Sequence, residues 1–261
     1  PLGVAQPGSL FEPEYPKQAG DYSYGWAEGF ILPKHFGLPT PGGANDTFDL
    51  FEAVVADTSF SSDRGLYDAP FDVSINTASP EAQIRYTLDG SMPTADSGLP
   101  YTSPIPITGT TILRAAAFKS GWIPTNIDTQ TYIFLDQVLS QTGAGFPATW
   151  GIDVWGRPPN TAPSNLPVAA DYEMDPAVVT DPVYSATILD DLQSLPILSL
   201  VMAPDDLFHP DTGLYANPPE RVEDPFHPEW GQRWEWEKSA SIEIIHPDGS
   251  AGTQSECGVR N

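Results

Sequence analysis

The sequence is poor in cysteine and in basic residues. Its single cysteine, Cys257, excludes a disulfide framework within the 261 residues. Only 11 lysines and arginines stand against 35 aspartates and glutamates, which gives a formal net charge of −24. We expect no nucleic-acid partner, because phosphates would be repelled. The carboxylates serve solubility in the simplest interpretation, and divalent-cation binding is the alternative.

Long apolar runs and an initiator methionine are also missing. No apolar stretch approaches the ~20 residues that cross a bilayer, so we expect no membrane span. The chain opens at Pro1 without the charged start and apolar run of a signal peptide. We therefore expect these residues to be a fragment that begins within a longer chain.

Aromatic residues make up 11% of the chain and hydrophobic residues 40%, a composition that argues against disorder. The 29 prolines and 22 glycines are spread throughout and favour short strands joined by turns. We predict a mainly β fold: a fibronectin III/immunoglobulin-like β-sandwich flanked by partial domains, with short helices in the C-terminal third.

The clearest β pattern begins at Phe71. Phe71, Val73 and Ile75 alternate with polar residues and should share one face of a strand. Further strands are predicted at residues 84–88, 112–118 and 129–134, and the Asp-Gly-Ser sequence at 89–91 predicts a turn. Short strands at this spacing indicate a small β-sandwich that folds on its own.

The same segment carries a specific signature in three motifs. They lie at residues 86–94 (YTLDGSMPT), 101–105 (YTSPI) and 113–121 (LRAAAFKSG). Together they resemble the chitobiase/β-hexosaminidase C-terminal-type domain, over residues 65–135. The resemblance implies a fibronectin III-like accessory module of secreted bacterial proteins, and it does not imply that this chain cleaves sugars.

Residues 1–46 are turn-rich, with islands of aromatic residues, and end in Pro-Thr-Pro-Gly-Gly-Ala-Asn at 39–45. This segment resembles the last strands of bacterial lamin-tail domains, which have an immunoglobulin-like β fold. We expect it to be the C-terminal end of such a domain, followed by a linker at residues 47–64.

The pattern changes after residue 135. Residues 136–192 should form a helix and a proline/glycine-rich connector, with a short helix at 135–141 and a longer one at 182–195 that Pro196 ends. Apolar strands are predicted at residues 197–202 and 240–245, and both fit one sheet.

A series of motifs in this part resembles the start of the spore coat protein H (CotH) kinase-like family. They lie at residues 145–151 (GFPATWG), 171–176 (DYEMDP), 195–200 (LPILSL), 205–208 (DDLF), 212–218 (TGLYANP), 236–243 (WEKSASIE) and 257–260 (CGVR). The resemblance makes residues 193–261 the N-terminal part of a CotH-like domain, truncated at Asn261. It implies that the parent is an atypical kinase that uses ATP with a divalent metal. In that family the ligands lie downstream, so we assign no catalytic, cofactor-binding or metal-binding residue to this chain.

Two groups of polar residues contain potential metal ligands. The four histidines, His35, His209, His227 and His246, lie too far apart in sequence to suggest zinc. The acidic loop at residues 204–213 is expected to be a turn with an aspartate cap, and a calcium loop is the alternative.

Trp230, Trp234 and Trp236 suggest either inward packing on a strand, which we favour, or stacking on a sugar. Glu235 and Glu237 could be the acid and base of a glycosidase, but one strand cannot show their separation across a cleft. Cys257 is expected on a strand, buried in the complete protein and partly exposed in this fragment.

We therefore expect a non-catalytic segment of an exported bacterial modular protein, with the sandwich as an accessory, adhesion or spacer module leading into the CotH-like domain. Two alternatives stay open: part of an atypical extracytoplasmic kinase, or a carbohydrate-binding module of a carbohydrate-active protein. The expected location is secreted or cell-surface, and the expected partner is an extracellular polysaccharide or protein.

Overall fold

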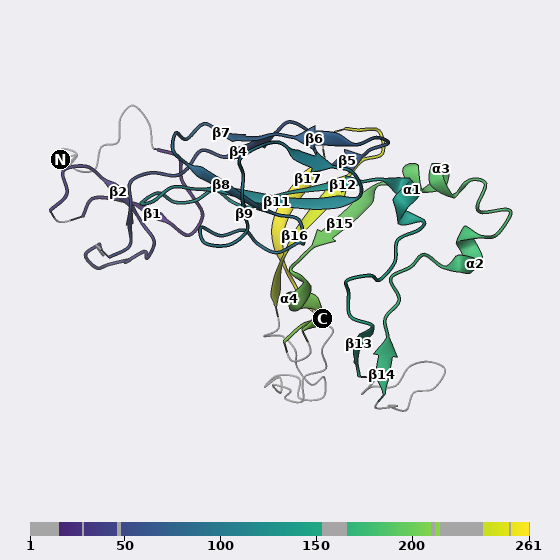
Figure 1. Ribbon diagram of the computed structural model, residues 1–261. Coiled ribbons are helices and arrows are strands. Elements are labelled where there is room, and N and C mark those ends of the chain that lie inside the picture. The colour runs from purple at the N-terminus through teal and green to yellow at the C-terminus, as the bar shows by residue number, and fades with distance from the viewer. Residues whose placement is uncertain are drawn as a thin grey trace, which may run out of the picture.

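A computed structural model describes residues 16–27, 29–45, 48–152, 166–209, 212–214, 237–250 and 252–260. The fold is mainly β, as the sequence predicts, with several small sheets and four short helices in these residues (Figure 1). None of the described helices is long and apolar enough to cross a membrane.

A five-stranded sheet with the order β5-β12-β11-β8-β9 forms one half of the β-sandwich. Its strands are β5 (Gly65–Leu66), β8 (Gln83–Thr87), β9 (Leu99–Pro100), β11 (Thr111–Phe118) and β12 (Asp128–Ile133). Two strand pairs form the other half. They are β4 (Thr58–Phe60) with β7 (Ile75–Thr77), and β6 (Phe71–Val73) with β10 (Ile105–Ile107).

The core lies between these two halves. Its buried members are Val73, Ile75, Ile105, Ile107, Leu113, Ala115, Tyr132 and Phe134. Phe71 packs against this cluster, so the predicted common face of Phe71, Val73 and Ile75 is confirmed. The chain changes partner at Ser74, between β6 and β7, and pairs first with β10 and then with β4.

The predicted turn after β8 is also confirmed. The backbone N–H of Ser91 donates to Asp89 Oδ1 at 3.0 Å, and Gly90 has a φ of 82°. A left-handed backbone of this kind favours glycine, because it has no Cβ. The Asp-Gly pair therefore sets the reversal of the chain.

A three-stranded sheet at the N-terminal end combines β1 (Ser23–Gly25), β2 (Lys34–Phe36) and β3 (Leu50–Phe51). Phe36 is buried in it, with 2% of its surface exposed. Directly after β3, the N–H of Val55 donates to the carbonyl of Ile123 at 2.9 Å. This bond joins the N-terminal part of the chain to the sandwich.

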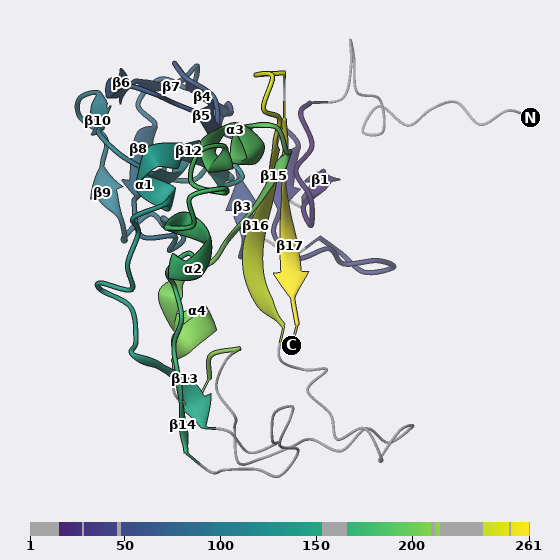
Figure 2. The same cartoon turned by 90° about the vertical axis from the view of Figure 1, so that its right-hand side faces the viewer.

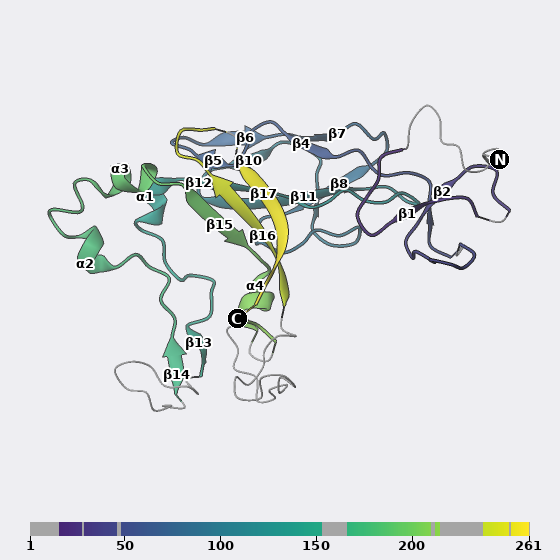
Figure 3. The same cartoon turned by 180° about the vertical axis from the view of Figure 1, so that it is seen from behind.

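The C-terminal sheet stacks on the outer face of the five-stranded sheet (Figures 2 and 3). It contains β15 (Ile197–Val201), β16 (Lys238–Ile245) and β17 (Thr253–Val259), all antiparallel. The predicted strands at 197–202 and 240–245 are confirmed, as is their common sheet. Because β11 is covered on both faces, its residues 113–117 are all buried.

The remaining elements are short. They are α1 (Leu135–Val138), β13 (Thr149–Ile152), β14 (Pro167–Ala169), α2 (Pro176–Val179), α3 (Ile188–Gln193) and α4 (Pro204–Phe208). The β13–β14 pair lies away from the sandwich (Figure 1).

The predicted helix at 182–195 is wrong in its first half, since α3 begins only at Ile188. The Asp181 carboxylate accepts hydrogen bonds from the backbone N–H groups of Val183 and Tyr184, which holds the preceding residues in turns. The predicted helix at 135–141 is likewise shorter than expected. The end of α3 before Pro196 agrees with the sequence.

We predict that residues 53–64 contribute to the stability of the sandwich. Val55 is fully buried, Phe60 packs on the core, and β4 pairs with β7. Residues 53–138 should therefore unfold cooperatively, and residues 65–135 should be less stable by at least about 3 kcal/mol, the cost of removing one large core side chain. Urea denaturation of both segments measures this; equal midpoints would contradict the prediction.

Candidate functional site

The contact between the sandwich and the C-terminal sheet centres on Glu243, in the middle of β16. Its side chain is fully buried. The N–H of Thr131 on β12 donates to Glu243 Oε1 at 3.2 Å, and the Thr131 hydroxyl donates to Oε2. Arg64 Nη1 lies 3.3 Å from Oε1. The carboxylate is thus held by Thr131 and Arg64 of the sandwich, together with a hydrogen bond from Ser199 on β15.

Burial raises the pKa of the Glu243 carboxyl above its ordinary value, and the Thr131 hydrogen bond and the Arg64 charge lower it in part. A perturbed carboxyl can mark a functional site when it faces a cleft. Glu243 faces Thr131 and Arg64 instead, and it lines neither of the two pockets described below. It therefore acts as an anchor between the two layers.

Arg114 makes a second polar contact across the same interface. It lies on β11 and is fully buried. Its Nη1 donates to the carbonyl of Gly90 at 3.0 Å, and its Nη2 donates to both carboxylate oxygens of Glu256 on β17, at 3.3 and 3.2 Å. A Cβ at Gly90 would lie 2.7 Å from the carbonyl oxygen of Met202, so this turn also packs closely against the end of β15.

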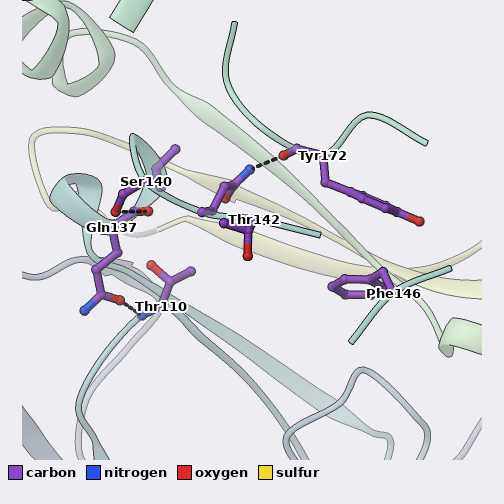
Figure 4. A pocket seen from close by; sticks show the side chains of 8 residues that line it. Thr110, Gln137, Ser140, Thr142, Phe146 and Tyr172 are labelled. Carbon is purple, nitrogen blue, oxygen red and sulfur yellow. Dashed lines mark hydrogen bonds between the residues drawn. The ribbon is translucent and has the colours of Figure 1, made fainter. Parts of the chain in front are cut away.

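A pocket of about 520 Å³ lies where the sandwich meets the connector (Figure 4). Thr110, between β10 and β11, forms one wall with Gln137 of α1, whose Oε1 accepts from the Thr110 N–H at 2.9 Å. Gln141 Nε2 donates to the carbonyl of Tyr172 at 3.0 Å. These bonds tie three separate segments of the chain around one cavity.

Phe146 and Tyr172 form the opposite wall, and two further aromatic side chains contact their rings. The rings of Phe146 and Tyr172 lie 5.3 Å apart between centroids, and Trp150 of β13 meets Tyr172 edge-on at 5.5 Å. Phe208 of α4 lies 5.8 Å from Phe146. A Cβ at Gly143 would lie 2.5 Å from the Tyr172 ring, so the close approach of this loop requires glycine.

A second pocket, of about 770 Å³, lies within the sandwich segment beside Trp122. The Lys119 ammonium stands 4.5 Å from the Trp122 ring centroid, lies 3.5 Å from Glu81, and donates to the carbonyl of Pro80 at 2.9 Å. One face of this aromatic ring is therefore already covered by the chain itself.

The acidic loop begins with α4, and the expected aspartate cap is wrong. The N-cap is Ala203 without a side-chain hydrogen bond, because Pro204 begins the helix and places Asp205 and Asp206 in its first turn. Asp206 pairs with Lys238 at 3.4 Å. Within the described ranges, no three His, Cys, Asp or Glu side chains form a group that could hold a metal ion. Asp211 lies outside those ranges, so the calcium alternative stays a prediction.

The other residues chosen from the sequence fall in different places. Trp230, Trp234, Trp236, Glu235 and His227 lie outside the described residues. Glu237 forms an ion pair with Arg260.

Cys257 lies on β17, opposite Ala240, so its predicted strand position is confirmed. Its side chain is partly exposed, in agreement with the expected exposure. His35 is buried on β2, and its Nε2 lies 3.2 Å from the carbonyl of Lys17.

Sequence reasoning missed the pocket and both buried anchors. The aromatic residues Phe146, Trp150 and Tyr172 were visible in the proline/glycine-rich connector, but no periodicity connected them. Glu243 occupies a polar position between apolar neighbours on a strand, which usually indicates a solvent-facing side chain. The pattern on this strand does not reveal that Glu243 instead faces polar groups of a second sheet.

Comparison with known proteins identifies the sandwich segment alone. The family model of the chitobiase/β-hexosaminidase C-terminal domain matches residues 62–129, which confirms the resemblance found in the motifs there. No curated protein matches the chain. No solved structure matches it either.

The raised pKa of Glu243 predicts a pH-dependent contribution to stability. Because the folded-state pKa lies above the unfolded one, the folded protein binds this proton more tightly. The resulting stabilisation is complete below the ordinary pKa of 4.5 and is lost as pH rises through the raised value. Glu243→Gln cannot titrate, so its stability relative to the wild type should increase as pH rises above 4.5. Denaturant unfolding of both proteins from about pH 4 to about pH 8 measures the difference, and a difference independent of pH contradicts the assignment.

Proposed function

We propose that this chain is a non-catalytic accessory segment of an exported bacterial modular protein, in which the sandwich holds the C-terminal sheet in a fixed position. The observation that carries the proposal is the buried polar contact at Glu243. A flexible tether would need no such contact, because it would leave neighbouring domains free to move. Glu243 belongs to the C-terminal sheet, and Thr131 of the sandwich donates hydrogen bonds to its buried carboxylate. Separating the two layers would break these bonds, so the contact holds the layers together.

The wider arrangement belongs to the same proposal. Residues 1–46 would be the end of a lamin-tail-like domain and residues 193–261 the start of a CotH-like domain. The two motif series given above support this arrangement. If the parent is an atypical kinase, its ATP and divalent metal would bind outside this chain. The expected location of the parent is secreted or at the cell surface.

A carbohydrate-binding role is a second candidate. The family matched by residues 62–129 takes its name from chitobiases and β-hexosaminidases, which act on sugars. The pocket beside Tyr172 adds a separate observation in favour of this role, because its lining is uncharged and partly aromatic.

The test of the accessory role is the thermal unfolding of the whole chain, followed by calorimetry. The wild type should show one transition that includes both the sandwich and the C-terminal sheet. Glu243→Ala leaves Arg64 without its buried partner, so it should destabilise the protein by about 3 to 5 kcal/mol and separate the two layers into two transitions.

Glu81→Ala is the matched control, because this glutamate is also paired with a cation but its side chain is 86% exposed. The control should change the stability by less than about 1 kcal/mol. Incubation of the wild type with chito-oligosaccharides should release no product. Hydrolysis, or two independent transitions in the wild type, would falsify the proposal.

A further inference from the structure

We propose that the pocket between α1 and Tyr172 binds a neutral saccharide. The inference deepens the carbohydrate-binding part of the proposed function and rests on it. Three features of the pocket support it: the absence of charge, the supply of polar groups, and a half-exposed aromatic ring.

The lining carries no ionisable group at neutral pH. It consists of Thr110, Gln137, Val138, Ser140, Gln141, Thr142, Phe146 and Tyr172. A phosphate, sulfate or uronate would find no cation there, and the net charge of −24 would repel it. A cationic ligand would find no carboxylate in the pocket. The lining therefore selects a ligand without charge.

Amide and hydroxyl groups surround the cavity from several segments. Gln137 uses its Oε1 for the Thr110 N–H, which leaves its Nε2 as a donor. Gln141 uses its Nε2 for the Tyr172 carbonyl, which leaves its Oε1 as an acceptor. Thr142 Oγ1 accepts from the Ala144 N–H, which leaves its hydroxyl proton. Ligand hydroxyls both donate and accept, so they match such a mixed set.

Phe146 supplies the apolar part of the site. Half of its surface, 50%, is exposed, and Figure 4 shows its ring beside Tyr172 across the pocket from Gln137. Sugar rings present C–H groups that pack on an aromatic face while their hydroxyls reach polar groups. A volume of about 520 Å³ lies within the usual range of small-molecule sites, about 300 to 1,000 Å³.

The pocket beside Trp122 is a poorer candidate for the same ligand. There Lys119 already stands over the aromatic ring and is itself paired with Glu81. A ligand would have to displace that ammonium group before it could use this face. We therefore expect the saccharide to bind in the pocket beside Tyr172 and not in the pocket beside Trp122.

The test is isothermal titration of the full chain with the neutral oligomers penta-N-acetylchitopentaose, cellopentaose and mannopentaose. At least one should bind saturably, with an affinity insensitive to salt because no charge is involved. Phe146→Ala and Gln141→Ala should each weaken that binding at least about tenfold. Tyr184→Ala is the matched control, since this aromatic residue is also exposed, at 56%, but lies outside the pocket; it should bind as the wild type does.

Circular dichroism of each variant shows whether it is folded. If Phe146→Ala does not fold, Gln141→Ala still tests the pocket. The proposal is overturned if none of the three sugars binds at about 1 mM, a weak affinity for a protein site. It is also overturned if binding survives both pocket substitutions, or if only a charged oligomer such as oligogalacturonate or oligolysine binds. A single unfolding transition without hydrolysis would leave the accessory role standing in each case.

Discussion

The arrangement of this chain depends on a carboxylate that is taken out of water between two sheets. Desolvation of Glu243 is costly, and it is offset by two hydrogen bonds from Thr131 and by the charge of Arg64. Both of these partners belong to the sandwich, and Ser199 on the neighbouring strand β15 adds a further hydrogen bond. Removing either layer would leave an unpaired group at the contact, so the two layers stabilise each other. Arg114 and Glu256 form a second pair across the same contact, again with the arginine in the sandwich and the carboxylate in the C-terminal sheet.

The C-terminal sheet turns two carboxylates toward the sandwich and several apolar side chains toward solvent. Its side chains that face the sandwich include Glu243 and Glu256, whereas its outward face carries Leu198, Leu200 and Ile244, which are 62%, 47% and 39% exposed. The inward face also carries Val201 and Ile245, each only 2% exposed, so apolar burial and polar pairing both act at this contact. A shift of one residue in register would turn Glu243 away from Thr131 and Arg64, so the polar pairing helps to set which residues of β16 face the sandwich.

The local structure could be predicted from the sequence where a single residue or a regular alternation of apolar residues determines it. Alternation fixed the common face of Val73 and Ile75, and the Asp-Gly pair at 89–90 fixed a turn. The sequence was insufficient where a side chain competes with the backbone, as Asp181 does at the turns before α3. It was also insufficient at the pocket and at Glu243. Both depend on segments that are distant in the chain, such as residues 110 and 172, and local patterns carry no information about such contacts.

The few lysines and arginines of the chain bear both on the contact between the two layers and on the kind of ligand that the pocket beside Tyr172 can bind. In the described part of the chain, carboxylates pair with the following cations: Lys34, Arg64, Arg114, Lys119, Lys238 and Arg260. These side chains hold the structure together, and none of them lines the pocket beside Tyr172. With a net charge of −24, the chain as a whole repels an anion. A ligand in that pocket would meet amides, hydroxyls and aromatic rings, because no charged side chain lines it.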